Sequence, residues 1–585
     1  MLYGMAKRTG PVHVVTTTRR YGGKVYHTHL LRRSYREGSI VRNETLGNLS
    51  HLPDPLITLI RRSLKGEVFV PAAAFEVTLS RLHGHVHAVA LAMQRLEVAK
   101  LLAARPCKER DCVLAMIAAR ILAPHTKLAT VRWWANTTLP ETFGVADADE
   151  QQLYAAMDWL LERQDRIQKK LATRHLEAGA MALYDLSSSY YEGATCPLAR
   201  RGYSRDGKKG TLQVNYGLLT DARGCPVAIS VHEGDTADPV TLDPEIDRLK
   251  TAFAIDRFVI VADRGMISQK AVDDFKTKKG VDWISALKSV SIRALVEGGQ
   301  IQLDLFDERN LFEVTSPDYP GERLIACRNR ELARHRAYKR EDMLAATEAN
   351  LLKIQARVAA GRLSGRDRIG LAVGKSVNQY KMAKHFTLDI GDDALAFSRN
   401  RDKIAAEAAL DGVYVIRTSL PAEHMSAPDC VRSYKSLSRV ERAFRTMKSV
   451  DLKIRPIHHR LADRVRAHIL LCMLAYYVEW HMREAWAPLL FTDEDQAAKL
   501  TRDPVAPATR SAKALRKVQT RHLDDGSPTH SFSTLLDELA TITRNTCRTP
   551  GANAADRDTA PSFQLTTTAS PQQRRAYDLI ETIVL

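Results

Sequence analysis

Three carboxylate residues in this sequence could together perform metal-dependent chemistry. Asp185 follows the short apolar run 181–184, Asp263 follows the apolar run 258–262, and Glu441 lies in a helical pattern rich in cations. Catalytic groups of an open α/β sheet gather at strand ends, although an Asp after a strand is also a common turn residue or helix cap. Three carboxylates can hold two Mg²⁺ ions about 4 Å apart, which suits phosphoryl transfer.

The segment 434–448 is strongly basic around its single carboxylate. Between residues 431 and 470 there are eleven Lys/Arg and three Asp/Glu. Seven residues make nearly two helical turns, so the spacing predicts Tyr434, Glu441 and Lys448 on nearly one line of a helix, with Arg445 beside them. A surface helix with a Glu–Arg pair is the alternative. An apolar stripe predicts the packed face of this helix: Leu437, Val440, Phe444 and Met447.

Size and charge limit the class of protein. The chain has 585 residues, too many for one core, so we expect three or four modules. A net charge of +18 favours an anionic partner, of which nucleic acid is the commonest. We expect no membrane association, because the sequence shows no amphipathic anchor and its longest apolar run, Ile469 to Val478, is too short to span a bilayer.

Cysteine and histidine spacing does not indicate a zinc site. The eight cysteines are scattered, and Cys107 and Cys112 have no second pair nearby, so we interpret the cysteines as reduced thiols in a cytosolic protein without a secretory signal. The histidines between 455 and 486 lack the spacing that places ligands on one helix face. We interpret them as core or phosphate contacts: His458, His459, His468 and His481.

The N-terminal third divides into two modules. Residues 1–65 carry twelve Lys/Arg against three acids, and short β-like runs separated by turn residues predict a small antiparallel sheet followed by a helix at 56–64. We interpret this basic, β-rich module as a DNA contact, with a solvated basic edge as the alternative. Residues 66–178 carry apolar residues at three-to-four spacing, which predicts a helical domain that we expect to bind DNA.

Residues 179–287 predict the first part of an α/β domain. Their order is strand, strand, strand, helix, strand, helix, strand, which indicates a mixed sheet that begins with a hairpin and ends with parallel crossovers. A further strand at 413–417 precedes the Glu441 helix, so residues 411–487 complete the domain.

Residues 288–410 are predicted to be an insertion within this domain. They include possible strands at 301–305 and 312–315 and a long basic helix at about 329–360. The run 370–376 resembles a phosphate-binding loop but has one residue too few between its glycines and no preceding strand. Beyond it, residues 488–585 are predicted to form C-terminal helices, with linkers at 503–507 and 550–561.

These residues together resemble the bacterial insertion-sequence DDE transposases, in the branch with a Tyr-x2-Arg-x3-Glu-x6-Lys signature. Tyr434, Glu441 and Lys448 match that spacing. Asp185 in Leu-Tyr-Asp-Leu-Ser and Asp263 in Val-Ala-Asp-Arg-Gly match the first and second acids.

The sequence departs from the signature at one position. Leu437 stands where the family has Arg, and Arg439 and Arg445 are the candidates for that role. In the glycine-rich loop 200–210, Arg205, Lys208 and Lys209 are further candidates for DNA-backbone contacts, with a solvated loop as the alternative.

The resemblance implies a fold and a function. The fold is an α/β, ribonuclease-H-like mixed sheet, interrupted by an insertion before the last catalytic helix. The function is to bind the terminal inverted repeats of an insertion sequence, cleave the DNA strands and transfer them to new DNA. Asp185, Asp263 and Glu441 would hold Mg²⁺, for which Mn²⁺ can substitute, while Tyr434 and Lys448 would grip the DNA.

It also implies partners and a location. These are the double-stranded DNA of transposon ends and target, a second copy of the chain in a homodimer on that DNA, and the bacterial cytoplasm, at the nucleoid when DNA is bound. Two other functions fit the sequence: a catalytically inactive DNA-binding relative, and a metal-dependent nuclease without end specificity.

Overall fold

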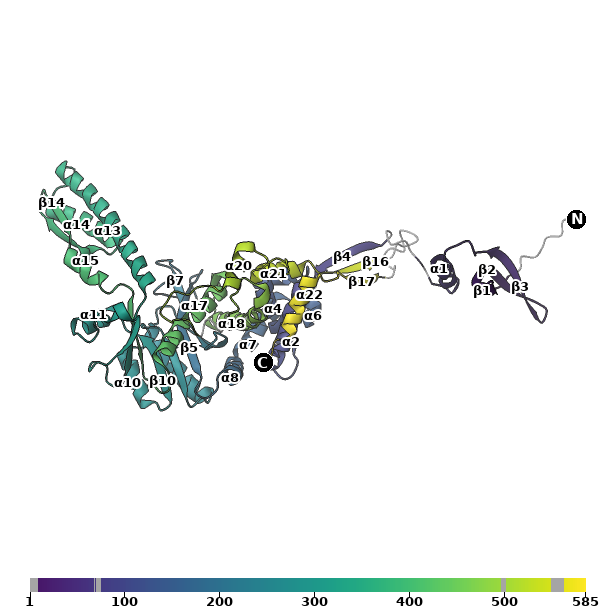
Figure 1. Cartoon of the computed structure of the whole chain (residues 1–585), viewed down its shortest axis with the longest axis horizontal. Helices are drawn as coiled ribbons and strands as arrows, with labels where there is room; N and C mark the ends of the chain where they lie inside the picture. The colour runs from purple at the N-terminus through teal and green to yellow at the C-terminus, as the bar shows by residue number, and fades with distance from the viewer. Residues whose placement is uncertain (1–8, 68, 70–74, 496–500, 549–561) are drawn as a thin grey trace. The chain divides into compact units, whose positions relative to one another are not determined.

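The computed structural model describes residues 9–67, 69, 75–495, 501–548 and 562–585 (Figure 1). The chain forms two compact units, Met1–Ser80 with Arg544–Thr566, and Arg81–Thr543 with Thr567–Leu585. The linker expected at 550–561 lies outside the described residues.

The first unit is built from two small sheets. Strands β1 (Val12–Tyr21), β2 (Lys24–Glu37) and β3 (Ile40–Asn48) form an antiparallel meander, followed by helix α1 (Asp54–Leu64). Gly22 and Gly23 have φ of 59° and 74°, as the tight turn between β1 and β2 requires. The predicted sheet and helix are therefore confirmed. The second sheet was not predicted and joins β4 (Glu76–Leu82), β16 (Thr543–Arg548) and β17 (Ser562–Thr566).

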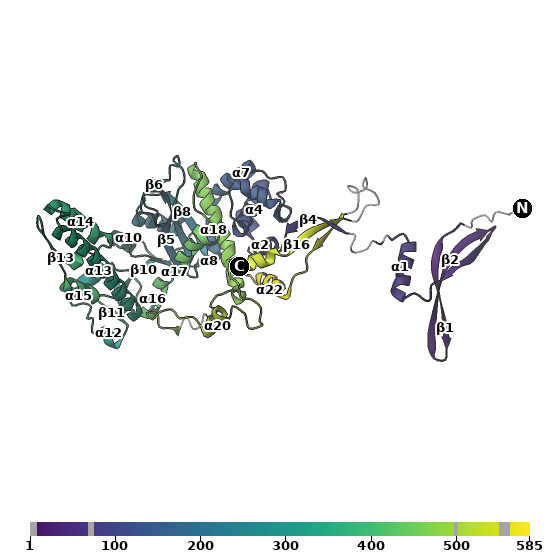
Figure 2. The ribbon, with the colours of Figure 1, turned by 90° about the horizontal axis from the view of Figure 1, so that it is seen from above.

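A nine-stranded mixed sheet is the centre of the second unit (Figure 2). Its first strands are antiparallel: β5 (Met181–Tyr190), β7 (Leu212–Asp221) and β8 (Pro226–Glu233), with the two-residue β6 (Arg200–Arg201) on β7. On the other side of β5, β9 (Phe258–Ala262) and β10 (Val281–Ala286) run parallel. Every residue of β9 is buried, as expected for a central parallel strand. The predicted mixed sheet is confirmed.

Three more strands extend this sheet beyond β10. They are β15 (Val413–Thr418), β12 (Arg323–Arg328) and β11 (Leu311–Val314), each antiparallel to its neighbour. The sequence predicts an insertion at 288–410, whereas β11 and β12 within this range belong to the main sheet. The strand predicted at 301–305 is wrong, because Leu305 begins the short helix α12 (Leu305–Glu308), which follows α11 (Ser289–Glu297).

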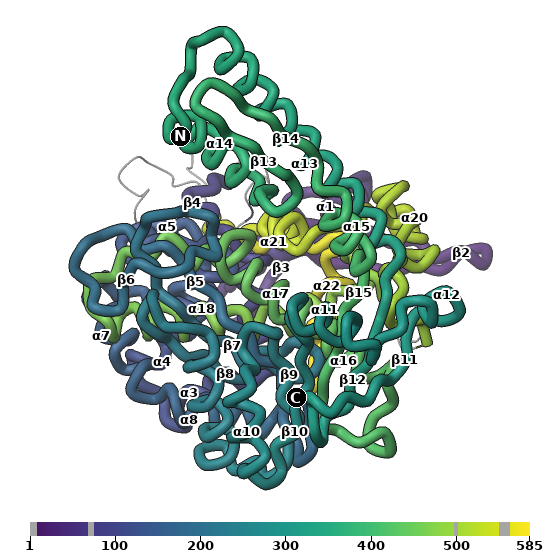
Figure 3. Tube along the Cα trace, turned by 90° about the vertical axis from the view of Figure 1, so that its left-hand side faces the viewer, coloured from purple at the N-terminus to yellow at the C-terminus, as the bar shows by residue number. Residues whose placement is uncertain are grey.

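The remainder of that segment has a hydrophobic core of its own. It comprises α13 (Arg330–Ala359), α14 (Arg366–Gln379), β13 (Phe386–Ile390), β14 (Leu395–Arg399) and α15 (Arg401–Ala408). Figure 3 shows α13, α14 and the β13–β14 pair side by side. The long helix predicted at 329–360 is confirmed. Residues 370–376 lie inside α14, so they do not form a phosphate-binding loop.

Helices cover the sheet and share its core. Those before β5 are α2 (Gly84–Arg95), α3 (Val98–Leu102), α4 (Lys108–Leu122), α5 (Lys127–Trp134), α6 (Leu139–Phe143), α7 (Glu150–Leu161) and α8 (Gln164–His175). The long helix α18 (Ala462–Ala485) packs on α4, α7 and β8, so one buried cluster joins helices and sheet. Near the C-terminus, α20 (Ala512–Thr520) precedes α21 (Phe532–Ala540) and α22 (Pro571–Glu581), and the latter two pack on α2.

Among the described residues no single helix is long and apolar enough to cross a membrane. The pair α4 and α5, bent by 89°, reaches that length and composition only when the two are counted together.

Candidate active site

Asp185 and Asp263 lie at the same edge of two adjacent parallel strands. Tyr184 of β5 lies opposite Ala262 of β9, and each acid is the next residue along the chain. Asp185 was expected just after its strand, and this is wrong: β5 continues to Tyr190 because its second half pairs with β7. Asp185 nevertheless lies where the pairing with β9 ends, so both acids stand at one edge.

Glu441 comes from a helix that packs on β5. We expected one helix across 434–448, but the chain forms α16 (Ala427–Lys435) and α17 (Leu437–Arg445), followed by a wider π-helical turn at Thr446–Val450. The two helices pack on different strands, α16 on β10 and α17 on β5. At the break, the Ser436 hydroxyl donates to the Arg432 carbonyl (3.1 Å), a contact that bends helices.

The predicted apolar stripe fixes the orientation of α17. Leu437, Val440, Phe444 and Met447 are all buried, and Phe444 meets the ring of Tyr216 on β7 edge-on, with centroids 5.7 Å apart. Because these side chains face the sheet, Glu441 remains exposed on the side nearest the strand acids.

The three acids line one open cavity of about 470 Å³. Its carboxylates are Asp185, Asp206, Asp238, Asp263 and Glu441, and Phe444, Met266 and Leu186 are its apolar neighbours. Its cations are Arg205, Arg445, Lys448 and Arg455, and the remaining lining residues are Ser187, Tyr203 and Ser449. Carboxylates and cations face the same space, as phosphoryl transfer requires.

The environment of Asp185 fits a divalent cation. Its Oδ1 accepts a hydrogen bond from the Leu186 amide at 2.8 Å. Burial, followed by the negative charges of Asp263 and Glu441, raises the pKa of Asp185 to about 7. A cation shared by three carboxylates offsets this repulsion, and carboxylate oxygens are the ligands that Mg²⁺ and Mn²⁺ prefer.

Tyr434 contacts one of the acids. Its hydroxyl donates to Oδ1 of Asp263 at 3.0 Å, although the two residues are 171 positions apart. Burial, together with the charge of Asp263, raises the pKa of Tyr434, so the phenol stays protonated and remains a donor.

The cations of the cavity differ in their partners. Lys448 is 9% exposed and donates to Oδ1 of Asp206 at 2.9 Å, and Arg455 pairs with the same oxygen. Arg205 pairs with Asp238. Arg445 is exposed, and no ion pair with it is seen within the described ranges.

Three predicted DNA contacts do not line this cavity. Arg439 donates to the carbonyl of Ala222 in the β7–β8 turn, and Lys208 lies 3.5 Å from the centroid of the Tyr190 ring. Lys209 is exposed on the same loop. Of the two candidates for the role of the signature Arg, therefore, only Arg445 faces the acids. Leu437, at the signature position itself, is packed in the core.

Sequence reasoning missed Asp206 and Arg455. Asp206 is 1% exposed at its side chain, accepts the Tyr190 amide at 3.1 Å and holds two cations at the cavity wall. Asp206 is the single acid in the basic loop 200–210. This isolated negative charge is the feature of the sequence that could have identified it as a partner of cations.

Two family models match parts of the chain. Residues 192–478 match the model of the transposase DDE domain, a range that holds Asp263 and Glu441 but begins after Asp185. Residues 14–70 match the model of the IS1634 family transposase N-terminal domain. No curated protein matches the chain.

One solved structure with a match is the cryo-EM structure of a piggyBac transposase synaptic complex with hairpin DNA. It has 7% sequence identity and a TM-score of 0.34, over 78% of this chain and 79% of that chain, a level too low to establish a shared fold. The two family matches together span more than half of the sequence and follow the order of an insertion-sequence transposase. The chain therefore belongs to the insertion-sequence DDE transposases.

Proposed function

We propose that this transposase binds the terminal inverted repeats of its insertion sequence, cuts the DNA there and joins the freed ends to target DNA. The observation that carries the proposal is the single cavity in which Asp185, Asp263 and Glu441 face Arg445 and Lys448. Carboxylates alone would repel a DNA backbone, and cations alone would bind DNA without cleaving it.

The catalytic core is proposed to be ribonuclease-H-like. Three antiparallel strands, β5, β7 and β8, are followed along the chain by β9 and β10, which lie parallel on the other side of β5. The group α13–α15 lies between this part and α17, which supports an insertion before the last catalytic helix.

Asp185, Asp263 and Glu441 would hold Mg²⁺ or Mn²⁺. Such ions, when bound, activate the attacking oxygen and stabilise the leaving oxygen. Tyr434 orients the Asp263 carboxylate through its hydrogen bond. Arg445 offsets the charge of the scissile phosphate, and Lys448, held by Asp206, adds positive potential at the cavity wall.

The reaction has two nucleophiles. Water attacks the phosphodiester at the element end first, which frees a 3′-hydroxyl. That hydroxyl then attacks a phosphodiester of the target, so each step forms one P–O bond and breaks another. Two ends must meet one target, and we propose a homodimer on the DNA for this reason.

End recognition is proposed to reside in the N-terminal unit. Its sheet β1–β3 and α1 carry nine of the twelve Lys/Arg of residues 1–65. Contacts with phosphates position a protein on DNA without reading its sequence, so a separate module that reads base edges is needed for specificity.

The test is cleavage of the element's own end fragments by the purified full chain, with Mg²⁺ and with EDTA. Cutting at the end should require the metal and disappear in Asp263→Asn. The matched control is Asp256→Asn, an exposed Asp just before the opposite end of β9. Specific binding without cutting by the wild type would favour an inactive relative, and metal-dependent cutting without end specificity would favour a nuclease.

A further inference from the structure

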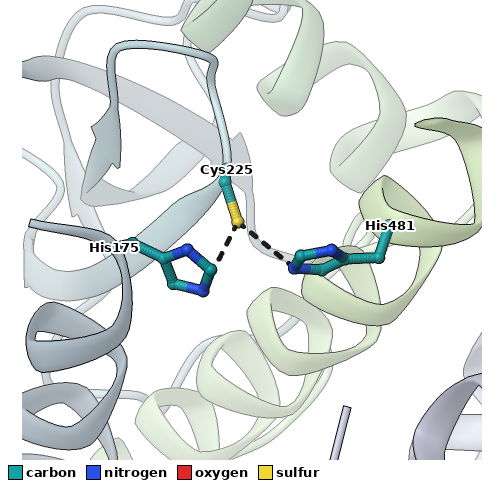
Figure 4. A group of neighbouring side chains, drawn as sticks. All are labelled: His175, Cys225 and His481. Atoms are coloured by element: carbon teal, nitrogen blue, oxygen red, sulfur yellow. Dashed lines mark hydrogen bonds between the residues drawn. The ribbon is translucent and has the colours of Figure 1, made fainter. Parts of the chain in front are cut away.

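A second group of potential ligands lies away from the acids. His175, Cys225 and His481 point toward one another (Figure 4), and one ligand atom from each lies within 4.8 Å of the others. The Cys225 sulfur is 3.7 Å from Nε2 of His481 and 4.0 Å from Nε2 of His175. The three come from the end of α8, the β7–β8 turn and α18.

These distances are close to those of a zinc site. Zinc–sulfur bonds of about 2.3 Å and zinc–nitrogen bonds of about 2.0–2.1 Å at tetrahedral angles separate sulfur and nitrogen by about 3.6 Å. The observed sulfur–nitrogen separations exceed that value by only a few tenths of an ångström. Small rotations of the two rings would close the difference.

Burial keeps the two imidazoles in the neutral form that binds metals. It lowers the pKa of His175 to about 4 and that of His481 to about 3, so both rings are neutral and carry a lone pair at neutral pH. Cys225 is fully buried, and burial raises the pKa of its thiol. Metal binding would break the S–H bond, form a metal–sulfur bond and release one proton to solvent.

Two cations, Arg174 and Arg223, line the adjoining cavity, and each has a carboxylate partner, which for Arg174 is Glu97 at 4.0 Å. Arg223 is paired with Asp221, whose Oδ2 accepts from the guanidinium at 2.9 Å. Glu484 lines the same cavity as His175 and His481, a space of about 360 Å³. It supplies a carboxylate to the space that both imidazoles line.

We propose that His175, Cys225 and His481 bind one zinc ion, with water at the fourth position on the side of Glu484. Thiolate and imidazole ligands select zinc over Mg²⁺, which prefers oxygen. Unlike the proposed active site, this site is a structural clamp: it fixes the turn between β7 and β8 to α8 and α18.

The clamp would also support the catalytic helix. Gly224 of the same turn has φ of 88°, and a Cβ there would lie 2.9 Å from Cβ of Arg439 at the start of α17. Arg439 in turn donates to the carbonyl of Ala222. The turn that carries Cys225 therefore packs against the first turn of α17.

The positions of the three ligands explain why no zinc-binding motif is visible in the sequence. His481 was interpreted as a core or phosphate contact because the histidines near it are not spaced for one helix face. The other two ligands are 306 and 256 positions away, on separate elements. No short motif can connect them.

The experiment is metal analysis of the full chain, expressed in zinc-supplemented medium and purified without a histidine tag. We expect about one zinc per chain, lost in Cys225→Ser and in His175→Gln, and a thiolate-to-metal charge-transfer absorption when Co²⁺ replaces zinc. His175 is only partly buried, so its variant folds even if Cys225→Ser does not. The matched control is Cys472→Ser, a buried cysteine 4.0 Å from Nε2 of His468 in the same helix, which should keep the zinc.

Two results would overturn the proposal: a zinc-free wild-type protein, or a zinc content that is unchanged in both ligand variants. Asp263→Asn should retain full zinc, so loss of DNA cleavage and loss of this site are distinguishable. A melting temperature that falls after zinc removal in the wild type, but not in His175→Gln, would support the clamp.

Discussion

The hydroxyl of Tyr434 donates a hydrogen bond to Oδ1 of Asp263 across 3.0 Å. The tyrosine lies at the end of α16 and the acid lies directly after β9. One oxygen of the Asp263 carboxylate is thereby fixed, while the other remains available to a ligand. We therefore assign Tyr434 a positioning role for an acid, in place of the DNA grip that the family signature implies.

Tyr434→Phe should slow cleavage while end binding stays intact. Removing one hydrogen bond to a charged group is worth about 1.5–3 kcal/mol, which corresponds to a fall of roughly 10- to 100-fold in the single-turnover rate. Raising the Mg²⁺ concentration should partly restore the rate, because the phenol acts through the carboxylate. A variant that cuts normally but binds end DNA poorly would show that Tyr434 contacts DNA instead of positioning the acid.

Arg445→Ala and Lys448→Ala should separate DNA contact from structural support. Arg445 is exposed in the cavity, so its loss should reduce the slope of log affinity against log salt by about one. Lys448 is bonded to Asp206, so its loss should leave that slope unchanged and lower the free energy of unfolding by about 1–3 kcal/mol. DNA binding by fluorescence anisotropy at several salt concentrations, with thermal melts, measures both. A reduced slope in Lys448→Ala alone would contradict the assignment.

Glu479→Gln should change how stability depends on pH. Glu479 on α18 is fully buried, and burial raises its pKa to about 8 despite the Arg483 guanidinium 2.6 Å away. Because the pKa of Glu479 is raised in the folded protein, protonation of Glu479 stabilises the fold. This stabilisation is complete below about pH 4.5 and is lost as the pH rises through about 8.

Glutamine does not titrate, so the free energy of unfolding of the variant should rise relative to that of the wild type by roughly 4 kcal/mol between pH 5 and pH 9. Melting temperatures across that range measure the difference. Glu538→Gln, on α21, is the matched control for the substitution itself. A variant that is equally destabilised at every pH would show that the ion pair with Arg483 dominates.

Deleting residues 1–66 should reduce binding to element ends more than binding to unrelated DNA. The deletion removes β1–β3 and α1, which belong to the separate N-terminal unit, so the α/β sheet should keep its fold. Competition binding with end and scrambled fragments compares the two losses. Equal losses would mean that the deleted residues contribute only non-specific electrostatic binding.

The sequence predicted elements best where the pattern was local. The all-apolar run of β9 and the apolar stripe of α17 are each read from neighbouring residues, and each is present. The same applies to the turn glycines between β1 and β2.

Long-range packing decided the rest. The break at Ser436 accompanies the packing of α16 and α17 on different strands, which no spacing within 434–448 records. Asp206, Arg455 and the His–Cys–His group depend on contacts between residues far apart in the chain. Strand β5 likewise passes beyond Asp185 only because β7 pairs with its second half.

Helix α18 has a consequence for how the protein can be divided. It is buried from His468 to Met482 and packs at once on α4, α7 and β8. The helices before β5 and the sheet after it are therefore one cooperative folding unit, although they look like separate modules in the sequence. A fragment cut at residue 179 would expose one long apolar face of α18 to water and aggregate, so a minimal catalytic fragment has to keep the helices from α2 onward.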